Sequence, residues 1–125
     1  MKIYFLDDEA VNLKLIELLG KKETELDLNF FTSYEEMYQV LAQNQLENSL
    51  PNIIVTDIRM PGIDGFEVVK RVSSEFPDIK LMYCSAFSSL KTAIQEKSVE
   101  IEESLQRAYY VKPIRSDIFD MIKSL

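Results

Sequence analysis

The sequence predicts one α/β domain, an open and doubly wound parallel sheet with helices on both faces. Short apolar runs alternate five times with segments whose apolar residues recur every three or four positions, which is the pattern of strands alternating with helices. The runs contain few polar residues, as expected for strands covered on both faces. Of 125 residues, 46% are apolar, so we expect residues 1–125 to form a single domain around one sheet.

The first unit pairs a strand at residues 2–7 with a helix at residues 11–21. Gly20 should end this helix, because glycine readily adopts the backbone conformation that terminates helices. Spacing by three and four residues predicts the buried face of the helix, which comprises Val11, Leu15, Leu18 and Leu19.

The second and third units carry signals for the start of a helix. After a strand at residues 28–32, Ser33 and Glu36 form a capping box. After a strand at residues 52–57, Asp64 resembles a second N-cap. The expected buried faces of the two helices comprise Tyr34, Met37, Tyr38 and Leu41 in one, and Phe66, Val69, Val72 and Phe76 in the other.

The fourth strand is predicted at residues 79–84 and the fifth at residues 108–111. Between them, apolar residues at helical spacing indicate one long helix, with Lys97-Ser98 as a polar point where it could break. The face of this helix comprises Leu90, Ile94, Ile101 and Leu105. The face of a final helix comprises Ile118, Met121, Ile122 and Leu125.

The composition excludes several classes of function. The chain has no histidine, which removes Ser-His-Asp and Cys-His catalysis and most zinc sites. Its one cysteine, Cys84, has no partner for an intramolecular disulfide and is interpreted as a buried thiol. A net charge of −7 disfavours direct nucleic-acid binding. Apolar runs are too short for a membrane span or a signal peptide, so we expect a cytoplasmic protein.

Chemically active side chains follow the ends of the predicted strands. Strands joined by right-handed crossovers all end at one edge of a sheet, and ligands bind there where the strand order reverses. In the flavodoxin-like order 2-1-3-4-5, the first and third strands are neighbours at that point. Asp7, Asp8 and Asp57 should therefore lie together, with Ser85 and Lys112 to one side.

Three carboxylates in one shallow site repel each other, by about 4 kcal/mol for a pair about 4 Å apart at an effective dielectric constant of about 20. Mg²⁺ offsets such repulsion, and it prefers a few carboxylates with waters and a phosphoryl oxygen. With the charge of Lys112 and the hydroxyl of Ser85, the set predicts a phosphoryl-transfer site whose nucleophile is Asp57. The alternative is that the acids and Lys112 are solvated surface charges and that Ser85 caps a helix.

Four segments, taken in order, resemble the signature of response-regulator receiver domains, the phosphoacceptor modules of two-component signal transduction. They are residues 3–9, 57–65, 85–86 and 111–113. Each motif is weak by itself, since a double aspartate or a Lys-Pro pair is common. All four at the ends of predicted strands are a specific joint signal that covers nearly the whole chain.

The resemblance implies that Asp57 accepts a phosphoryl group from a phosphohistidine on a sensor histidine kinase or a phosphotransfer protein. It also implies that Asp8 and Asp57 hold Mg²⁺ directly, with the backbone carbonyl of Arg59 as a third ligand. Asp7 would act mainly through water, and Lys112 would pair with the phosphoryl oxygens. Such a domain is not an enzyme in the usual sense, because it catalyses only its own phosphorylation and dephosphorylation.

The resemblance further implies a switch. Ser85 would bond the phosphorylated acid, while an aromatic residue moves inward and remodels the face made by the fourth helix, the fifth strand and the fifth helix. We favour Tyr109 over Tyr110 by its distance from Lys112, with simple core packing of Tyr109 as the alternative. The remodelled face would control an output domain or protein and could support a homodimer. The Lys112-Pro113 peptide is expected to be cis.

Two departures from the family pattern concern the output face. The stretch between Ser85 and Lys112 is longer than usual, and no glycine turn precedes the fifth strand. Two rival functions remain: a degenerate receiver that binds a partner without being phosphorylated, and an aspartyl-phosphate phosphatase. Phosphatases of that kind usually carry an Asp-x-Asp pair, whereas this chain has Asp7-Asp8-Glu9.

Overall fold

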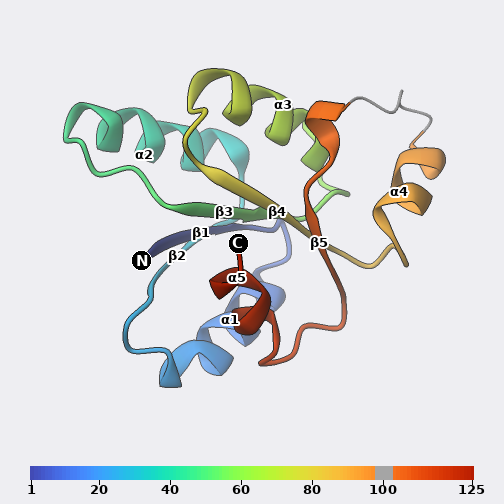
Figure 1. Cartoon of the computed structure of the whole chain (residues 1–125), viewed down its shortest axis with the longest axis horizontal. Helices are drawn as coiled ribbons and strands as arrows, with labels where there is room; N and C mark the ends of the chain where they lie inside the picture. Colours follow the sequence, from blue (N-terminus) through green and yellow to red (C-terminus); the bar gives the residue numbers. More distant parts are fainter. Residues whose placement is uncertain (98–102) are drawn as a thin grey trace.

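In a computed structural model, which describes residues 1–97 and 103–125, the chain forms a five-stranded parallel sheet in the order β2-β1-β3-β4-β5 (Figure 1). All four strand pairings are parallel, so the predicted fold and strand order are confirmed. Each strand end lies within one residue of its prediction. The strands are β1 (Lys2–Leu6), β2 (Asp27–Phe31), β3 (Ile53–Thr56), β4 (Lys80–Ser85) and β5 (Ala108–Val111).

Helices cover both faces of the sheet, with α2 and α3 on one face and α1 and α5 on the other (Figure 1). The helices are α1 (Ala10–Leu19), α2 (Tyr34–Leu46), α3 (Gly65–Glu75), α4 (Leu90–Glu96) and α5 (Ile118–Lys123), with short 3₁₀ turns η1 (Gly20–Lys22) and η2 (Glu103–Leu105). None of the helices in the described parts of the chain combines the length and apolar character that a bilayer crossing requires.

The core consists of two apolar clusters, one on each face of the sheet. Successive strand residues point to opposite faces, so Tyr4 and Leu6 join the cluster under α2 and α3 while Ile3 and Phe5 join the cluster under α1 and α5. Ala93 and Ile94 of α4 belong to the first cluster. Burial on both faces explains why the central strand β3 is buried throughout and has Thr56 as its one polar residue.

The predicted helix caps are confirmed. The Ser33 hydroxyl accepts a hydrogen bond from the backbone N–H of Glu36 (3.2 Å), and the Asp64 carboxylate accepts one from Glu67 (2.9 Å). A third cap, in which Ser89 accepts from the backbone of Thr92 (3.1 Å), opens α4. The alternative that Ser85 caps this helix is therefore wrong, because Ser85 is the last residue of β4.

The predicted buried face of α1 is wrong except for Leu19, which is partly buried against the core. Leu13 and Ile16 are buried, whereas Val11, Leu15 and Leu18 are 70%, 38% and 49% exposed. Apolar residues surround most of this helix, so two different stripes satisfy the helical period. Tertiary packing selects between them, because Leu13 and Ile16 pack in the cluster that contains Ile3 and Phe5 of β1.

Between β4 and β5, the prediction of one continuous helix is wrong, whereas the expected break at Lys97 is confirmed. The helix α4 ends at Glu96 with Lys97 as its C-cap, while Leu105 lies in η2. The Tyr83 hydroxyl of β4 donates a hydrogen bond to the Leu105 carbonyl (2.9 Å), and this holds η2 against the core. Lys97 is polar where an apolar residue would have continued the buried face. Ser98 and Ile101 lie outside the described residues.

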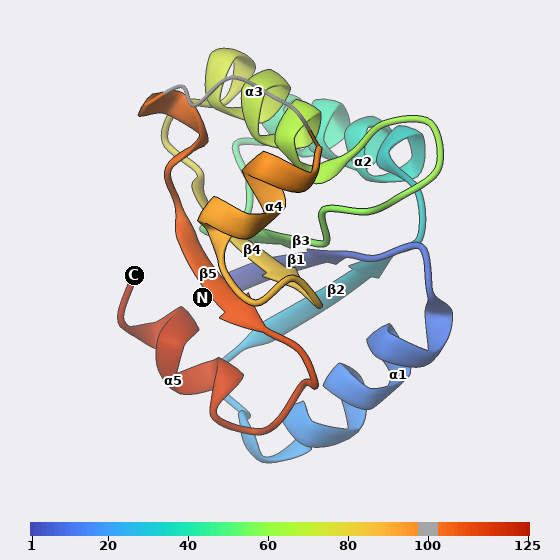
Figure 2. The same ribbon diagram turned by 90° about the vertical axis from the view of Figure 1, so that its right-hand side faces the viewer.

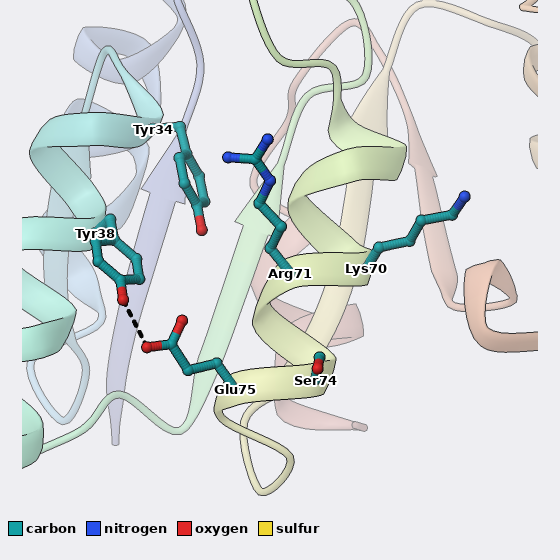
Figure 3. A pocket seen from close by; sticks show the side chains of 6 residues that line it. All are labelled: Tyr34, Tyr38, Lys70, Arg71, Ser74 and Glu75. Carbon is teal, nitrogen blue, oxygen red and sulfur yellow. Dashed lines mark hydrogen bonds between the residues drawn. The ribbon is translucent and has the colours of Figure 1, made fainter.

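A groove runs between the outer sides of α2 and α3, with a volume of about 530 Å³ (Figure 3). The Tyr38 hydroxyl donates to Glu75 (2.6 Å), and the Arg71 guanidinium lies 5.6 Å from the centre of the Tyr34 ring. These contacts connect the two helices. The residues that line the groove include none of the predicted site residues, so the groove is separate from the predicted phosphoryl-transfer site.

Candidate phosphoryl-transfer site

The three predicted acids lie together at the carboxyl edge of the sheet. Asp7 and Asp57 immediately follow β1 and β3, whose connections to the next helices lie at the same edge (Figure 2). Backbone hydrogen bonds extend the sheet to both acids, since Asp7 donates to Phe31 (3.1 Å) and Asp57 to Leu6 (3.0 Å). One carboxylate oxygen from each of Asp7, Asp8 and Asp57 lies within 4.8 Å of the other two. Asp7 and Asp57 are buried, whereas Asp8 is exposed.

Lys112 bridges two of these acids. Its ammonium lies 3.0 Å from Oδ2 of Asp7 and 3.0 Å from Oδ2 of Asp57. Its backbone N–H donates to the Ser85 carbonyl (2.8 Å), and the Lys112-Pro113 peptide is cis as predicted. Burial by itself would lower the pKa of Lys112, but hydrogen bonds with Asp57 and Asp7 raise it above its ordinary value. The ammonium therefore stays charged at neutral pH.

The pKa of Asp57 is also raised above its ordinary value, but here burial is the cause. Burial raises the pKa of Asp57, and the hydrogen bond and charge of Lys112 partly offset that rise. One carboxylate oxygen, Oδ1, accepts from the backbone N–H of Ile58 (2.7 Å), and the other, Oδ2, faces Lys112. The carboxylate is therefore held in one orientation beside a cation, which suits a nucleophile that must meet an incoming group in line.

Asn12 is a site residue that the sequence reading missed. Its side-chain amide donates to Oδ2 of Asp7 (3.1 Å), the oxygen that also faces Lys112, and the backbone N–H of Glu9 donates to Oδ1 (2.9 Å). The available signal is position: Asn12 lies in the first turn of the helix that follows the strand ending before Asp7. Asn12 was not predicted because the interpretation of this helix rested on its apolar residues alone.

The mouth of the site is a cavity of about 480 Å³ beside Asp57. Its lining comprises Glu9, Asn12, Asp57, Arg59, Ser85, Ala86, Phe87 and Lys112. The Arg59 guanidinium lies 5.1 Å from the centre of the Phe87 ring, so these two side chains form one wall. Ser85 belongs to the same lining and is buried. The structure thus brings Arg59, Ser85 and Lys112 to the acid that sequence reasoning had identified.

The two tyrosines of β5 point to opposite faces of the sheet. Tyr109 packs against the cluster under α2 and α3, and its ring lies 6.2 Å from that of Tyr83. Its hydroxyl donates a hydrogen bond to the Phe87 carbonyl (2.7 Å). Burial raises the pKa of Tyr109, and an interaction with the Ser85 side chain partly opposes the rise. Tyr110 lies in the other cluster and bonds Asp117. Of the two, Tyr109 is the one that contacts the site wall.

The donor set fits a hard divalent cation. Three carboxylates at this separation offer only oxygen ligands, which are the ligands that Mg²⁺ prefers, and the exposed Asp8 leaves a side open to water. Sulfur and imidazole ligands are absent from the cluster, which disfavours zinc. The cluster of Asp7, Asp8 and Asp57 therefore fits a magnesium site.

Gly65 permits the close approach of α3 to the segment that carries Asp57. A β-carbon at this position would lie 2.3 Å from the Asp57 carbonyl oxygen and 2.8 Å from Cα of Ile58. We expect Gly65→Ala to lower the free energy of unfolding by about 1–3 kcal/mol, because backbone atoms must shift to make room. Urea denaturation measures this loss. Gly62→Asn is the comparison: an added β-carbon there meets no atom within 4 Å, so its loss comes from the positive φ of 80° alone and should be smaller, because asparagine is enriched at positive φ.

Cys84 is buried beneath the site and is 5% exposed. Burial raises the pKa of its thiol to about 12. At pH 8 the native protein should then react with a thiol reagent about 1000-fold more slowly than the unfolded chain, whose thiol has a pKa of about 8.5. Thiol labelling that is quenched at a series of times, with and without denaturant, measures the two rates. Equal rates would contradict the assigned burial.

The fold and the site define a class: a doubly wound α/β domain with an acidic cluster and a bridging lysine at its topological switch point. A family model described as the response regulator receiver domain matches residues 3–119. The chain therefore belongs to the response-regulator receiver domain family of two-component systems.

Individual relatives agree with this assignment. The chain is 33% identical over 119 residues to a sensory transduction protein, LytT, of Oceanobacillus iheyensis, which covers 95% of the chain and 46% of that protein. It is 27% identical to the transcriptional regulatory protein YesN of Bacillus subtilis, over 99% of the chain and 33% of that protein. The chain thus spans between a third and about half of the length of these curated relatives.

Solved structures show the same fold. A two-component transcriptional regulator from Clostridium phytofermentans superposes with a TM-score of 0.75 at 21% identity, covering 99% of this chain and 91% of that one. The BeF3-activated receiver domain of DrrB superposes with a TM-score of 0.73 at 17% identity, covering 98% and 94%. At such low sequence identity these matches show the fold alone.

Proposed function

We propose that this domain accepts a phosphoryl group on Asp57 from a phosphohistidine, in a reaction that depends on Mg²⁺ held by Asp8, Asp57 and the backbone carbonyl of Arg59. The observation that carries the proposal is the Lys112 ammonium 3.0 Å from Asp57 Oδ2, in a cluster of three carboxylates. Such a set positions a nucleophile and neutralises charge, which is nearly all that phosphoryl transfer requires.

In the proposed reaction an Asp57 oxygen attacks phosphorus, the phosphorus–nitrogen bond of the donor breaks, and the imidazole leaves with the bonding electron pair. Bound Mg²⁺ would neutralise charge on the transferring group. Lys112 would pair with the phosphoryl oxygens, and Asp7 would act mainly through water. The backbone N–H of Ile58, which donates to Oδ1, keeps the attacking carboxylate oriented. No other substrate is turned over, so the domain catalyses only its own modification.

The donor would be a sensor histidine kinase or a phosphotransfer protein in the cytoplasm. Its phosphohistidine must enter through the mouth lined by Glu9 and Asn12. The helix that carries Asn12 presents the exposed apolar side chains of Val11, Leu15 and Leu18. An exposed apolar stripe that begins beside the mouth supports α1 as part of the surface that contacts the donor.

Phosphorylation would be read out through Ser85 and Tyr109. The buried Ser85 would bond a phosphoryl oxygen, and Tyr109 would exchange its hydrogen bond with the Phe87 carbonyl for an inward position. Movement on this side would remodel the face of α4, β5 and α5, which would control an output domain or a separate protein and could form a homodimer. This is a population shift driven by contacts that only the phosphorylated state makes.

The test is phosphoryl uptake from a small donor. The protein is incubated with acetyl phosphate, with and without Mg²⁺, and intact mass is measured. The proposal expects an adduct of phosphate mass that forms only with Mg²⁺. A domain that binds partners without phosphorylation would show no adduct under either condition, although all five expected pocket residue types are present. That result would replace the proposed function by the degenerate receiver.

The wall formed by Arg59 and Phe87 is expected to protect the phosphorylated acid. The guanidinium over the ring narrows the mouth through which hydrolytic water must pass. We expect the double variant Arg59→Ser and Phe87→Ser to lose phosphate about 10-fold faster or more, because water gains access to the phosphorus. Decay of the adduct after removal of the donor measures the half-life. An unchanged half-life would show that the wall does not limit hydrolysis.

A further inference from the structure

The Asp7 carboxylate is the most extensively hydrogen-bonded acid of the site, and its partners divide between its two oxygens. Oδ1 accepts from the backbone N–H of Glu9 (2.9 Å). Oδ2 accepts from the Asn12 amide (3.1 Å) and from the Lys112 ammonium (3.0 Å). A carboxylate offers about four acceptor positions. Within the described chain, these donors therefore fill Oδ2 and leave one position on Oδ1.

The remaining position determines how Asp7 can serve a cation. With Oδ2 occupied by two donors, Oδ1 is the oxygen that keeps a position for a cation held with Asp8 and Asp57, either directly or through a bound water. The Asn12 amide and the Glu9 N–H hold opposite oxygens, so together they prevent the carboxylate from rotating. Hydrogen bonds from groups behind a ligand fix its orientation in this way at metal sites generally.

The Asn12 contact becomes more important once Asp57 is phosphorylated. The single Lys112 ammonium now serves both Asp7 and Asp57. A phosphoryl group on Asp57 attracts that ammonium and weakens its contact with Asp7. Asp7 is 4% exposed, so an oxygen left without a donor would carry a large desolvation cost. The Asn12 amide is neutral, does not follow the phosphoryl charge, and keeps Oδ2 bonded.

We infer that Asn12 is a positioning residue, whose amide holds the Asp7 carboxylate toward the cation site while Lys112 is free to move to the phosphoryl group. This inference rests on the proposed function. In this role Asn12 contacts Asp7 and does not contact the reacting atoms. Its effect passes through Asp7, so it should alter the affinity for the cation and leave the rate at saturating cation unchanged.

The test uses Mg²⁺ alone as the first probe. Amide chemical shifts of the site are followed by NMR during Mg²⁺ titration of the wild type, Asn12→Ala and Asn12→Leu, the latter keeping the branched shape of the side chain without its polar atoms. We expect the dissociation constant to rise about 10-fold in both variants, as is typical when a group that orients a metal ligand is lost. An unchanged constant in both variants overturns the inference.

Asn29→Ala is the matched control. Asn29 also donates from its amide to a carboxylate, that of Asp27 (3.3 Å), but on the edge strand β2 and outside the site. Its removal should leave Mg²⁺ affinity unchanged. If it weakened Mg²⁺ binding as much as Asn12→Ala does, the effect would be a general loss of stability and the inference would fail.

The second probe is the rate of phosphoryl uptake from acetyl phosphate at several Mg²⁺ concentrations. A positioning role predicts slow uptake in Asn12→Ala at low Mg²⁺ and the wild-type rate at saturating Mg²⁺. A rate that stays low at saturation overturns the positioning role, because Asn12 would then act on the transfer itself. A wild type that binds Mg²⁺ but takes up no phosphate contradicts the proposed function instead, while the comparison of Mg²⁺ affinities still decides the role of Asn12.

Discussion

Asp57→Asn is expected to abolish phosphoryl uptake, with no adduct of phosphate mass after incubation with acetyl phosphate and Mg²⁺. Asparagine keeps the shape of the side chain and can still accept from the Ile58 N–H, but a neutral amide is not a competent nucleophile. Intact mass spectrometry measures the loss. Uptake at the wild-type level would mean that a different residue is modified and would contradict the assignment of Asp57.

The same variant should also bind Mg²⁺ more weakly, because it removes one of three clustered carboxylates. Asp8→Asn provides the comparison: it should weaken Mg²⁺ binding while leaving the acceptor oxygen of Asp57 in place. Unchanged affinity in both variants would place the cation elsewhere. Residual slow uptake in Asp8→Asn, with none in Asp57→Asn, is the pattern that separates a metal ligand from the acceptor.

The stability of Asp57→Asn should depend on pH in a defined direction. Burial raises the pKa of Asp57, so the folded wild type binds this proton more tightly than the unfolded chain does. The stability that Asp57 contributes is greatest below its unfolded pKa and falls as the pH rises through its folded pKa. In buffer without Mg²⁺, the variant should therefore gain stability relative to wild type as the pH rises from acidic values. Urea denaturation across that range measures the difference.

Lys112→Met is expected to be the most destabilising substitution in the site. It leaves Asp7 and Asp57 facing each other with side chains only 6% and 8% exposed. Removing one partner of a buried ion pair commonly costs about 3–5 kcal/mol, and we expect about 3 kcal/mol here because Asp57 can take up a proton. Denaturation in urea without Mg²⁺ measures the change. Phosphoryl uptake should fall as well, since the phosphoryl oxygens lose their cation.

Two further measurements show whether charge is the cause. Mg²⁺ at about 100 times its dissociation constant should restore about 2.7 kcal/mol to the variant, as binding does for any form of the protein. The dissociation constant itself reports the charge: it should be lower in Lys112→Met than in the wild type, because the ammonium no longer neutralises Asp7 and Asp57. Lys14→Met is the control, because Lys14 pairs with Glu17 (3.0 Å) on the exposed side of α1 and should contribute less than about 1 kcal/mol. If both lysine variants lost the same stability, or if Mg²⁺ bound Lys112→Met no more tightly than the wild type, the electrostatic account of Lys112 would fail.

The sequence was informative where a signal is local. Strand ends and the Ser33 and Asp64 caps followed from periodicity and cap chemistry, whereas the strand order was taken from the common flavodoxin-like topology and is confirmed. In that topology, the rule that parallel strands end at one edge placed Asp7 and Asp57 together, although they are far apart in the chain. No further information was needed for the strand ends and the caps, because these features depend on residue type and order alone.

The predictions that were wrong concern segments whose sequence pattern fits two different local arrangements. In α1, the stripes through Val11 and through Leu13 both satisfy the helical period, and only packing against the rest of the core chooses between them. In the segment after β4, apolar spacing suggested a helix that reached Leu105, whereas the Tyr83 hydroxyl holds that residue in a separate turn. A hydrogen bond between distant segments has no signature in local periodicity.

By itself, the sequence determined the class of fold and the identity of the acids and the lysine at the strand ends. Only the tertiary structure decided that Lys112 bridges Asp7 and Asp57, that Asn12 shares an oxygen of Asp7 with it, and which side of α1 is exposed. The physical reason is that backbone pattern sets where a residue sits. Side-chain partners depend on the rotation and packing of whole elements, which are global properties of the folded chain.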